Sequence, residues 1–190
     1  METGRSIGEL VVLMLLVLTG CQSANPPGEE ASVKKSEPPL VVASWEEVQQ
    51  MVAAHEGKVV VLDLWSTWCL PCMKEFPHLV EIHQDFPDHV ACISVSLNYT
   101  GAEDETPEDM REQVMPFLTA KKAFFQNVIS RDPDNVVMER ISLASIPAVM
   151  VFGRDGTLLK RFDNDQGLYG EGFTYPDNIL PLVKEAIAAR

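Results

Sequence analysis

The feature that most constrains the fold is an apolar run that leads almost directly into a cysteine pair. Residues 58–65 read KVVVLDLW, and after Lys58 only Asp63 interrupts the apolar side chains. A continuous run of this kind is typical of a central strand that is covered on both faces. Residues 71–86 then have the pattern of a helix, which Pro77 should kink because it lacks a backbone N–H. The stretch predicts a strand–helix unit within a layered α/β domain.

Signals for strands and helices alternate along the rest of the chain. Ser44 and Glu47 form a capping-box pattern at one helix start, and Thr106 followed by Pro107 indicates another. The elements that we expect are strands at 39–44, 89–97, 147–152 and 158–162, and helices from Ser44, from Thr106, from Asp132 and over 176–189. The sheet should be mixed, because helical crossovers join parallel strands whereas the turn RDGT joins an antiparallel hairpin.

Charge and length exclude some classes of protein. The chain has 28 Asp and Glu against 15 Lys and Arg, and its formal charge is −13. Nucleic acids select basic surfaces, so this balance argues against a nucleic-acid partner. Residues 40–190 have the composition of one ordinary globular domain, which is large enough to form a core without disulfide scaffolding.

The N-terminus has the features of an export signal. Residues 10–18 are nine consecutive apolar residues, which are too few to span a bilayer but suit the core of a signal peptide. The sequence LTGC that ends at Cys21 resembles the bacterial lipobox, in which the cysteine becomes the first mature residue and carries the lipid. We therefore expect residues 1–20 to be a lipoprotein signal peptide. The alternative is a plain secretory signal with an unrelated cysteine at its end.

The segment after Cys21 has the composition of a tether. Residues 22–39 are rich in Pro, Ser and Glu and have almost no apolar side chains, so they cannot bury enough surface to offset the cost of ordering. We expect 21–39 to be a lipidated cysteine with a flexible linker, followed by the domain at 40–190. Gln22, rather than an Asp, follows the cysteine, which favours the outer membrane in a cell that has two membranes.

The cysteine pair, Cys69 and Cys72, fits four kinds of site unequally well. Haem attachment requires a His directly after the second cysteine, where this chain has Met73. A structural zinc site requires four ligands, and the chain has no second Cys-x-x-Cys. Other side chains that stay open as zinc ligands are His78, His83, His89 and Cys92. Cys92 falls in a predicted core strand and is more typical of an inert buried thiol.

A structural disulfide is the third kind of site, but so short a ring removes little chain entropy.

A redox couple is the fourth kind of site, and the local sequence favours it. Cys69 would lie at the N-terminus of the predicted helix, where free N–H groups and the helix dipole favour the thiolate. Cys72 lies one turn deeper, within reach of a disulfide with Cys69. Pro71 stiffens the turn and Trp68 would cover one side of the sulfur. An exposed Cys69 would attack first, and a recessed Cys72 would resolve the mixed disulfide.

These residues resemble a known family. The WCLPC motif after the strand VVLDLW, the later proline of the helix and the sequence SIPAVMVF resemble the thioredoxin fold. The chain looks most like the exported TlpA/ResA-like branch of thiol-disulfide oxidoreductases. The features that carry this likeness are the sequence TWCLPCMKEFP, the inserted segment 98–123 and the lipoprotein-type anchor. The resemblance covers about residues 40–190. It implies an α/β thioredoxin fold, with a central mixed sheet flanked by helices on both faces and an inserted loop–helix segment.

The resemblance assigns roles to individual residues. Pro147 after Ile146 matches the cis-proline that faces the disulfide, and it implies a substrate-binding site formed with Trp68; the alternative is an ordinary trans proline. Asp63 matches a buried acid whose pKa should rise on burial and which accepts the proton of the second cysteine, although many ResA-like proteins have a neutral residue there. The alternative is a purely structural Asp63. Glu75 matches a glutamate near the cysteines, or it is an exposed helix acid without a role.

The function that follows is a membrane-tethered, extracytoplasmic thiol-disulfide oxidoreductase on the periplasmic face of a membrane. The resemblance implies a protein-disulfide reductase for exported proteins, with apocytochrome c as one candidate substrate, and a membrane-embedded electron donor. No nucleotide or metal cofactor is suggested, and the residues do not fix the direction of electron transfer. Two alternatives are a peptide-binding or chaperone module without redox turnover, and a peroxiredoxin-like peroxidase. The peroxidase would require one peroxidatic Cys with a Thr and an Arg around it, a setting that the sequence WCLPC lacks.

Overall fold

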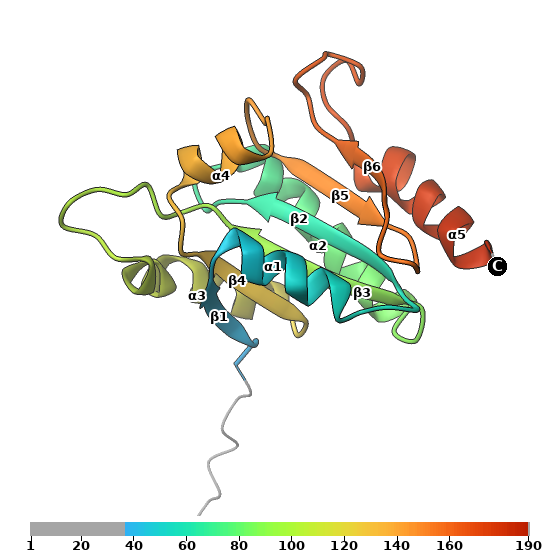
Figure 1. The fold of residues 1–190 in the computed structure, drawn as a ribbon, viewed down its shortest axis with the longest axis horizontal. Coiled ribbons are helices and arrows are strands. Elements are labelled where there is room, and N and C mark those ends of the chain that lie inside the picture. Colours follow the sequence, from blue (N-terminus) through green and yellow to red (C-terminus); the bar gives the residue numbers. More distant parts are fainter. Residues whose placement is uncertain (1–36, 190) are drawn as a thin grey trace, which may run out of the picture. The chain divides into compact units, whose positions relative to one another are not determined.

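A six-stranded mixed sheet forms the centre of the domain (Figure 1). The computed structural model describes residues 37–189. The predicted signal peptide (1–20), the lipidation site Cys21 and all but the last three residues of the predicted tether (21–39) lie outside this range. The strands are β1 (Leu40–Ala43), β2 (Val59–Trp65), β3 (Val90–Ser96), β4 (Gln126–Ser130), β5 (Ala148–Phe152) and β6 (Leu158–Phe162). Their order across the sheet is β1-β4-β3-β2-β5-β6.

The sheet is mixed in the way that its connections require. The pairs β1–β4, β4–β3 and β3–β2 are parallel, whereas β5 runs antiparallel to both β2 and β6. The helical elements are α1 (Trp45–Ala53), α2 (Leu70–Asp85), η1 (Pro107–Met110), α3 (Arg111–Lys121), α4 (Asp134–Arg140), η2 (Tyr175–Ile179) and α5 (Leu180–Ala188). The fold class expected from the sequence, a thioredoxin-like α/β fold with helices on both faces, is confirmed.

Two apolar cores cover the two faces of the sheet. One core joins alternate residues of β2, such as Val61 and Trp65, to α2, α3 and α5. The other joins the intervening residues, such as Leu62 and Leu64, to α1 and α4. Figure 1 shows α1 in front of the sheet and α2 behind it. Because β2 is buried on both faces, its side chains are apolar at almost every position, and Asp63 is the exception.

The structure differs from the sequence prediction mainly at β4. No strand was expected there, yet Gln126–Ser130 pairs with β1 on one side and β3 on the other. The buried Asn127 side chain hides the pattern, because an amide in a strand interior suggests a loop. Its Nδ2 donates to the carbonyl oxygens of Ala123 (2.8 Å) and Phe125 (2.7 Å), which satisfies it inside the core. The helix expected over 176–189 is present as η2 followed by α5.

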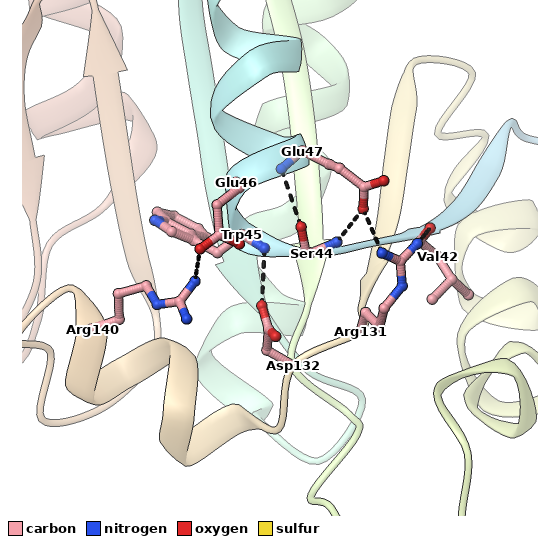
Figure 2. A network of polar contacts seen from close by, with 8 residues as sticks. All are labelled: Val42, Ser44, Trp45, Glu46, Glu47, Arg131, Asp132 and Arg140. Carbon is pink, nitrogen blue, oxygen red and sulfur yellow. Dashed lines mark hydrogen bonds and ion pairs between the residues drawn. The ribbon is translucent and has the colours of Figure 1, made fainter.

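A polar network joins the start of α1 to the end of β4 (Figure 2). The predicted capping box is present: the Glu47 N–H donates to Ser44 Oγ (3.3 Å) and the Ser44 N–H donates to Glu47 Oε2 (2.7 Å). Arg131, directly after β4, forms an ion pair with the same Glu47 oxygen (2.9 Å). Asp132 accepts the Trp45 N–H (3.0 Å). These contacts secure the edge strand β1 and place α1 across the sheet.

Candidate active site

The cysteine pair lies where β2 passes into α2. Cys69 is the N-cap of α2, with an extended backbone, and Cys72 lies in its first turn. The two sulfurs form a disulfide with an S–S distance of 2.00 Å. The Cys72 backbone N–H points at Cys69 Sγ at 3.3 Å, so one of the free N–H groups of the helix start faces this sulfur. The same geometry would stabilise a thiolate on Cys69 after reduction.

The expectation that Cys69 is exposed is wrong for the disulfide form. Cys69 is only 6% exposed, and Cys72 is 3% exposed. The physical reason is that the disulfide turns the Cys69 sulfur toward the helix, while Trp68 (54% exposed) and Leu70 (74% exposed) take the neighbouring surface. The order of attack therefore rests on the position of each cysteine along the helix, and the difference in exposure between them contributes little.

The turn before Cys69 is held by Asn98, a residue that the sequence did not single out. Asn98 Oδ1 accepts the Thr67 backbone N–H (3.0 Å), and its Nδ2 donates to Thr67 Oγ1 (2.6 Å). The same Nδ2 donates to Gln113 in α3 (3.1 Å). The inserted segment 98–123 thus supports the redox turn directly. Its signal in the sequence is weak, since Asn98 reads as the first residue of a polar loop.

Ile146 and Pro147 lie at the start of β5, next to the end of β2. The Ile146–Pro147 peptide bond is cis. Ala148 pairs with Leu64, which places Pro147 beside the carboxyl end of β2 and therefore at the same edge of the sheet as the cysteine turn. Trp68 is exposed at this edge. The structure therefore brings the three predicted substrate-binding residues, Trp68, Ile146 and Pro147, to one end of the sheet.

The segment that leads to Pro147 is held by β6 and the residues after it. The Arg161 guanidinium donates to the carbonyl oxygens of Ile141 (2.6 Å) and Ser142 (3.2 Å). Asp165 Oδ2 accepts the backbone N–H of Ala144 (2.8 Å). These bonds fix the turn from 141 to 144 and with it the approach to the cis-proline. Sequence reasoning placed Arg161 only in a hairpin strand and gave it no role.

Asp63 lies in the interior, on the face of β2 that α2 covers. Its side chain is buried, and its Oδ2 accepts a hydrogen bond from the Tyr175 hydroxyl at 2.7 Å. Burial raises the pKa of Asp63 to about 7, which the Tyr175 hydrogen bond opposes and the nearby charge of Glu75 increases. The rise in pKa has the direction expected from the sequence. The hydrogen bond by itself suits a structural acid as well as a proton acceptor.

Glu75 is half-buried, and its carboxylate has a partner. Its Oε2 accepts the backbone N–H of Tyr175 at 3.0 Å. The charge of Glu75 also acts on Asp63, so the two acids that the sequence singled out are electrostatically linked. Cys92, in β3, is a free buried thiol whose pKa is raised by burial and by Asp63, as suits an inert core residue.

A group of metal ligands and a membrane-spanning helix are both absent from the residues that the structure describes. Within residues 37–189, no three His, Cys, Asp or Glu side chains are grouped closely enough to hold a metal ion. In the same range, no helix combines the length and the apolar character that crossing a bilayer requires. The predicted zinc alternative therefore finds no ligand set in this part of the chain.

Known proteins with a similar sequence or fold agree on one family. The thioredoxin-like family model matches residues 57–158, more than half of the chain. The thiol-disulfide oxidoreductase ResA of Bacillus cereus is 24% identical over 162 residues, which cover 82% of this chain and 87% of that protein. A solved structure from Chlorobium tepidum, a candidate thiol:disulfide interchange protein DsbE, has a TM-score of 0.54 at 21% identity and covers 73% of this chain and 85% of its own.

A second solved structure has a similar fold. The exposed lipoprotein thioredoxin Etrx1 of Streptococcus pneumoniae has a TM-score of 0.50 at 24% identity, over 70% of this chain and 89% of that chain. At this level of identity the two structures establish the fold, whereas the match to the family model establishes membership of the family. The chain belongs to the thioredoxin-like family, as a thiol-disulfide oxidoreductase related to ResA.

Proposed function

We propose that the chain is a membrane-tethered reductase that exchanges disulfides with exported proteins. The observation that carries this proposal is the Cys69–Cys72 disulfide at the N-terminus of α2, with the buried acid Asp63 on the same face of the sheet. A short disulfide at a helix start is a poor staple, because it closes a small ring, and a good site for exchange.

The proposed reaction has two steps. The Cys69 thiolate attacks one sulfur of the substrate disulfide, a mixed disulfide forms, and the other substrate sulfur leaves as a thiolate. Cys72 then loses its proton to Asp63 and attacks Cys69, which closes the Cys69–Cys72 disulfide and releases the second substrate thiolate. Two electrons pass from the cysteine pair to the substrate. The Cys72 proton passes through Asp63 to one substrate thiolate, and the other substrate thiolate takes its proton from water.

The substrate-binding part of the proposal involves Trp68, Ile146 and Pro147. All three lie at the edge of the sheet where the disulfide is, and Trp68 offers an exposed aromatic face. Backbone groups beside Pro147 would pair with an extended substrate segment. Apocytochrome c is the candidate substrate that the resemblance implies, and its reduction would need a membrane-embedded donor to restore the dithiol.

The tether is proposed from the LTGC sequence that ends at Cys21. An exposed lipoprotein among the similar solved structures supports it. More than one acyl chain on the cysteine would hold the protein firmly, since each buried methylene contributes about 0.8 kcal/mol.

The substitution Cys21→Ser tests this part of the proposal. We expect the wild-type protein in the membrane fraction with its cysteine pair reduced, and the variant in the soluble fraction without bound lipid. Fractionation measures the location of the protein, labelling with a radioactive fatty acid measures the bound lipid, and alkylation of acid-quenched cells measures the redox state of the cysteine pair. Substitution of the nearby Ser23 by Ala is the matched control and should change none of them. A variant that stays membrane-bound and lipidated would contradict the tether, and a wild-type pair that is fully oxidised in cells would contradict the reductase.

A further inference from the structure

The acids near the cysteine pair share one partner, Tyr175, that the proposed reaction does not yet use. Tyr175 is separated from Asp63 by 112 positions in the sequence, yet its hydroxyl donates to Asp63 Oδ2 at 2.7 Å. Its backbone N–H donates to Glu75 Oε2 at 3.0 Å. One residue therefore contacts both an acid of the central strand and an acid of the redox helix.

Tyr175 is held firmly enough to fix these two contacts. It is the first residue of η2, whose N-cap Thr174 accepts the Asp177 N–H through its side chain. The Thr174 backbone N–H in turn donates to Asn178 Oδ1 at 2.8 Å. The Tyr175 side chain is 1% exposed, so its hydroxyl has no alternative partner in solvent.

We propose that Tyr175 is a positioning residue of the redox site, which orients Asp63 through its hydroxyl and Glu75 through its backbone N–H. This inference rests on the proposed function of Asp63 as the group that takes the Cys72 proton. The bond that forms in that step is between Cys72 Sγ and Cys69 Sγ, the bond that breaks joins Cys69 to the substrate sulfur, and the proton of Cys72 passes to the Asp63 carboxylate.

The groups around Asp63 explain why such a partner matters. The titratable groups that act on Asp63 are Tyr175 from η2 and Glu75 from α2. The charge of Asp63 in turn acts on the buried Cys92 thiol of β3. Within residues 37–189, no positively charged side chain forms a hydrogen bond or an ion pair with Asp63. The Tyr175 hydroxyl is therefore the contact that favours the ionised carboxylate, against burial and the charge of Glu75, which both favour the protonated form.

The Tyr175 hydroxyl and the Glu75 charge predict shifts of opposite sign in the Asp63 titration, and a tyrosine that only packed in the core would produce no shift on loss of its hydroxyl. Tyr175→Phe removes the hydroxyl and leaves the backbone N–H in place, so the Asp63 titration should move to higher pH by roughly one unit. Glu75→Gln removes a negative charge but keeps an oxygen that can accept the Tyr175 N–H, so the titration should move to lower pH. The turnover profile against pH should shift in the same two directions.

Carboxyl carbon NMR of the full chain in its disulfide form measures the Asp63 titration directly, because the bonded cysteines do not titrate. Tyr169→Phe is the matched control, since Tyr169 packs on Phe162 and Phe173 and its hydroxyl has no hydrogen bond among the described residues. We expect the control to match the wild type. An unchanged midpoint in Tyr175→Phe, or a shift in the same direction as Glu75→Gln, would overturn the inference.

The measurement also separates this inference from the proposed function. The NMR titration needs no substrate and no turnover, so it reports on the surroundings of Asp63 independently of the proposed reaction. If Tyr175→Phe does not fold, the ring carbon Cζ of Tyr175 in the wild type decides: a signal that shifts at the Asp63 midpoint supports the hydroxyl contact, and a signal that does not change across that midpoint overturns the inference. If the Asp63 midpoints shift as expected but Asp63→Asn leaves turnover unchanged, the hydrogen bond between Tyr175 and Asp63 is supported. The catalytic role of Asp63, and the positioning role of Tyr175 that depends on it, would then be wrong.

Discussion

Cells that produce the Cys72→Ser variant are expected to accumulate mixed disulfides between Cys69 and substrate proteins. Cys69 still attacks, but no second thiol stands one helical turn away to release the product. Resolution within one molecule benefits from a very high effective concentration, so its loss should lower turnover on the order of a hundredfold or more. Non-reducing gels after acid quenching, followed by mass spectrometry of the adducts, provide the measurement.

Matched variants make the trapping result specific. Cys69→Ser/Cys72→Ser should form no adduct, because the attacking sulfur is gone. Cys92→Ala should behave like the wild type, since that thiol is buried in β3 and its raised pKa keeps it protonated. A Cys72→Ser protein that forms no adduct and retains its activity would identify a peptide-binding module instead of an oxidoreductase.

Asp63→Asn should give a protein that is slower but more stable at alkaline pH. In the folded state burial raises the Asp63 pKa from 3.8 to about 7, so the folded chain binds a proton that the unfolded chain has lost. The stabilisation that the protonated acid provides is complete below pH 3.8 and disappears as the pH rises through about 7. Asparagine cannot ionise, so the variant escapes this loss.

The expected size follows from the shift in pKa. A difference of about 3 units corresponds to roughly 4 kcal/mol. Urea unfolding at pH 4 and pH 8 measures the free energy of unfolding of Asp63→Asn and of the wild type. The difference between the two proteins should change in favour of the variant by that amount from pH 4 to pH 8. A constant cost of the buried amide cancels in this comparison. The exposed Asp85→Asn is the control and should show no such trend, whereas a flat trend for Asp63→Asn would contradict a buried acid with a raised pKa.

The same substitution separates the two interpretations of Asp63. If Asp63 accepts the Cys72 proton, the attack of Cys72 on the mixed disulfide should slow by about 10²–10⁴-fold in Asp63→Asn. A purely structural acid predicts the pH-dependent gain in stability with an unchanged rate. Both outcomes are compatible with the hydrogen bond to Tyr175, which is why the rate measurement is needed.

The sequence allowed most of the fold to be predicted because its signals are local. The apolar run of β2, the capping box at Ser44 and the Cys-x-x-Cys at a helix start each lie within a few residues, and the structure shows each of them. The missed strand β4 shows the limit of such signals. Asn127 is acceptable in the core only because carbonyl groups surround it, and the Pro39 carbonyl is 88 positions away.

The parts of the site that the sequence did not predict depend on distant contacts. Tyr175 reads as a loop residue before a helix, and only the folded chain brings it to Asp63. Arg161 reads as a strand residue, and its carbonyl partners lie before β5. The exposure of Cys69 was overestimated for a similar reason, because the direction of a sulfur at a helix start depends on the bond that it forms.

The central claim is that the N-terminus of α2 keeps Cys69 as a reactive thiolate in the reduced protein. The rate of alkylation of Cys69 against pH, followed by mass spectrometry in the reduced Cys72→Ser variant, tests this claim most directly. We predict a half-maximal rate at least one unit below the value of about 8.5 for a free cysteine, with alkylation already fast at pH 7. A midpoint at or above that value would show that the helix start does not activate the thiol, and would contradict the proposed reaction.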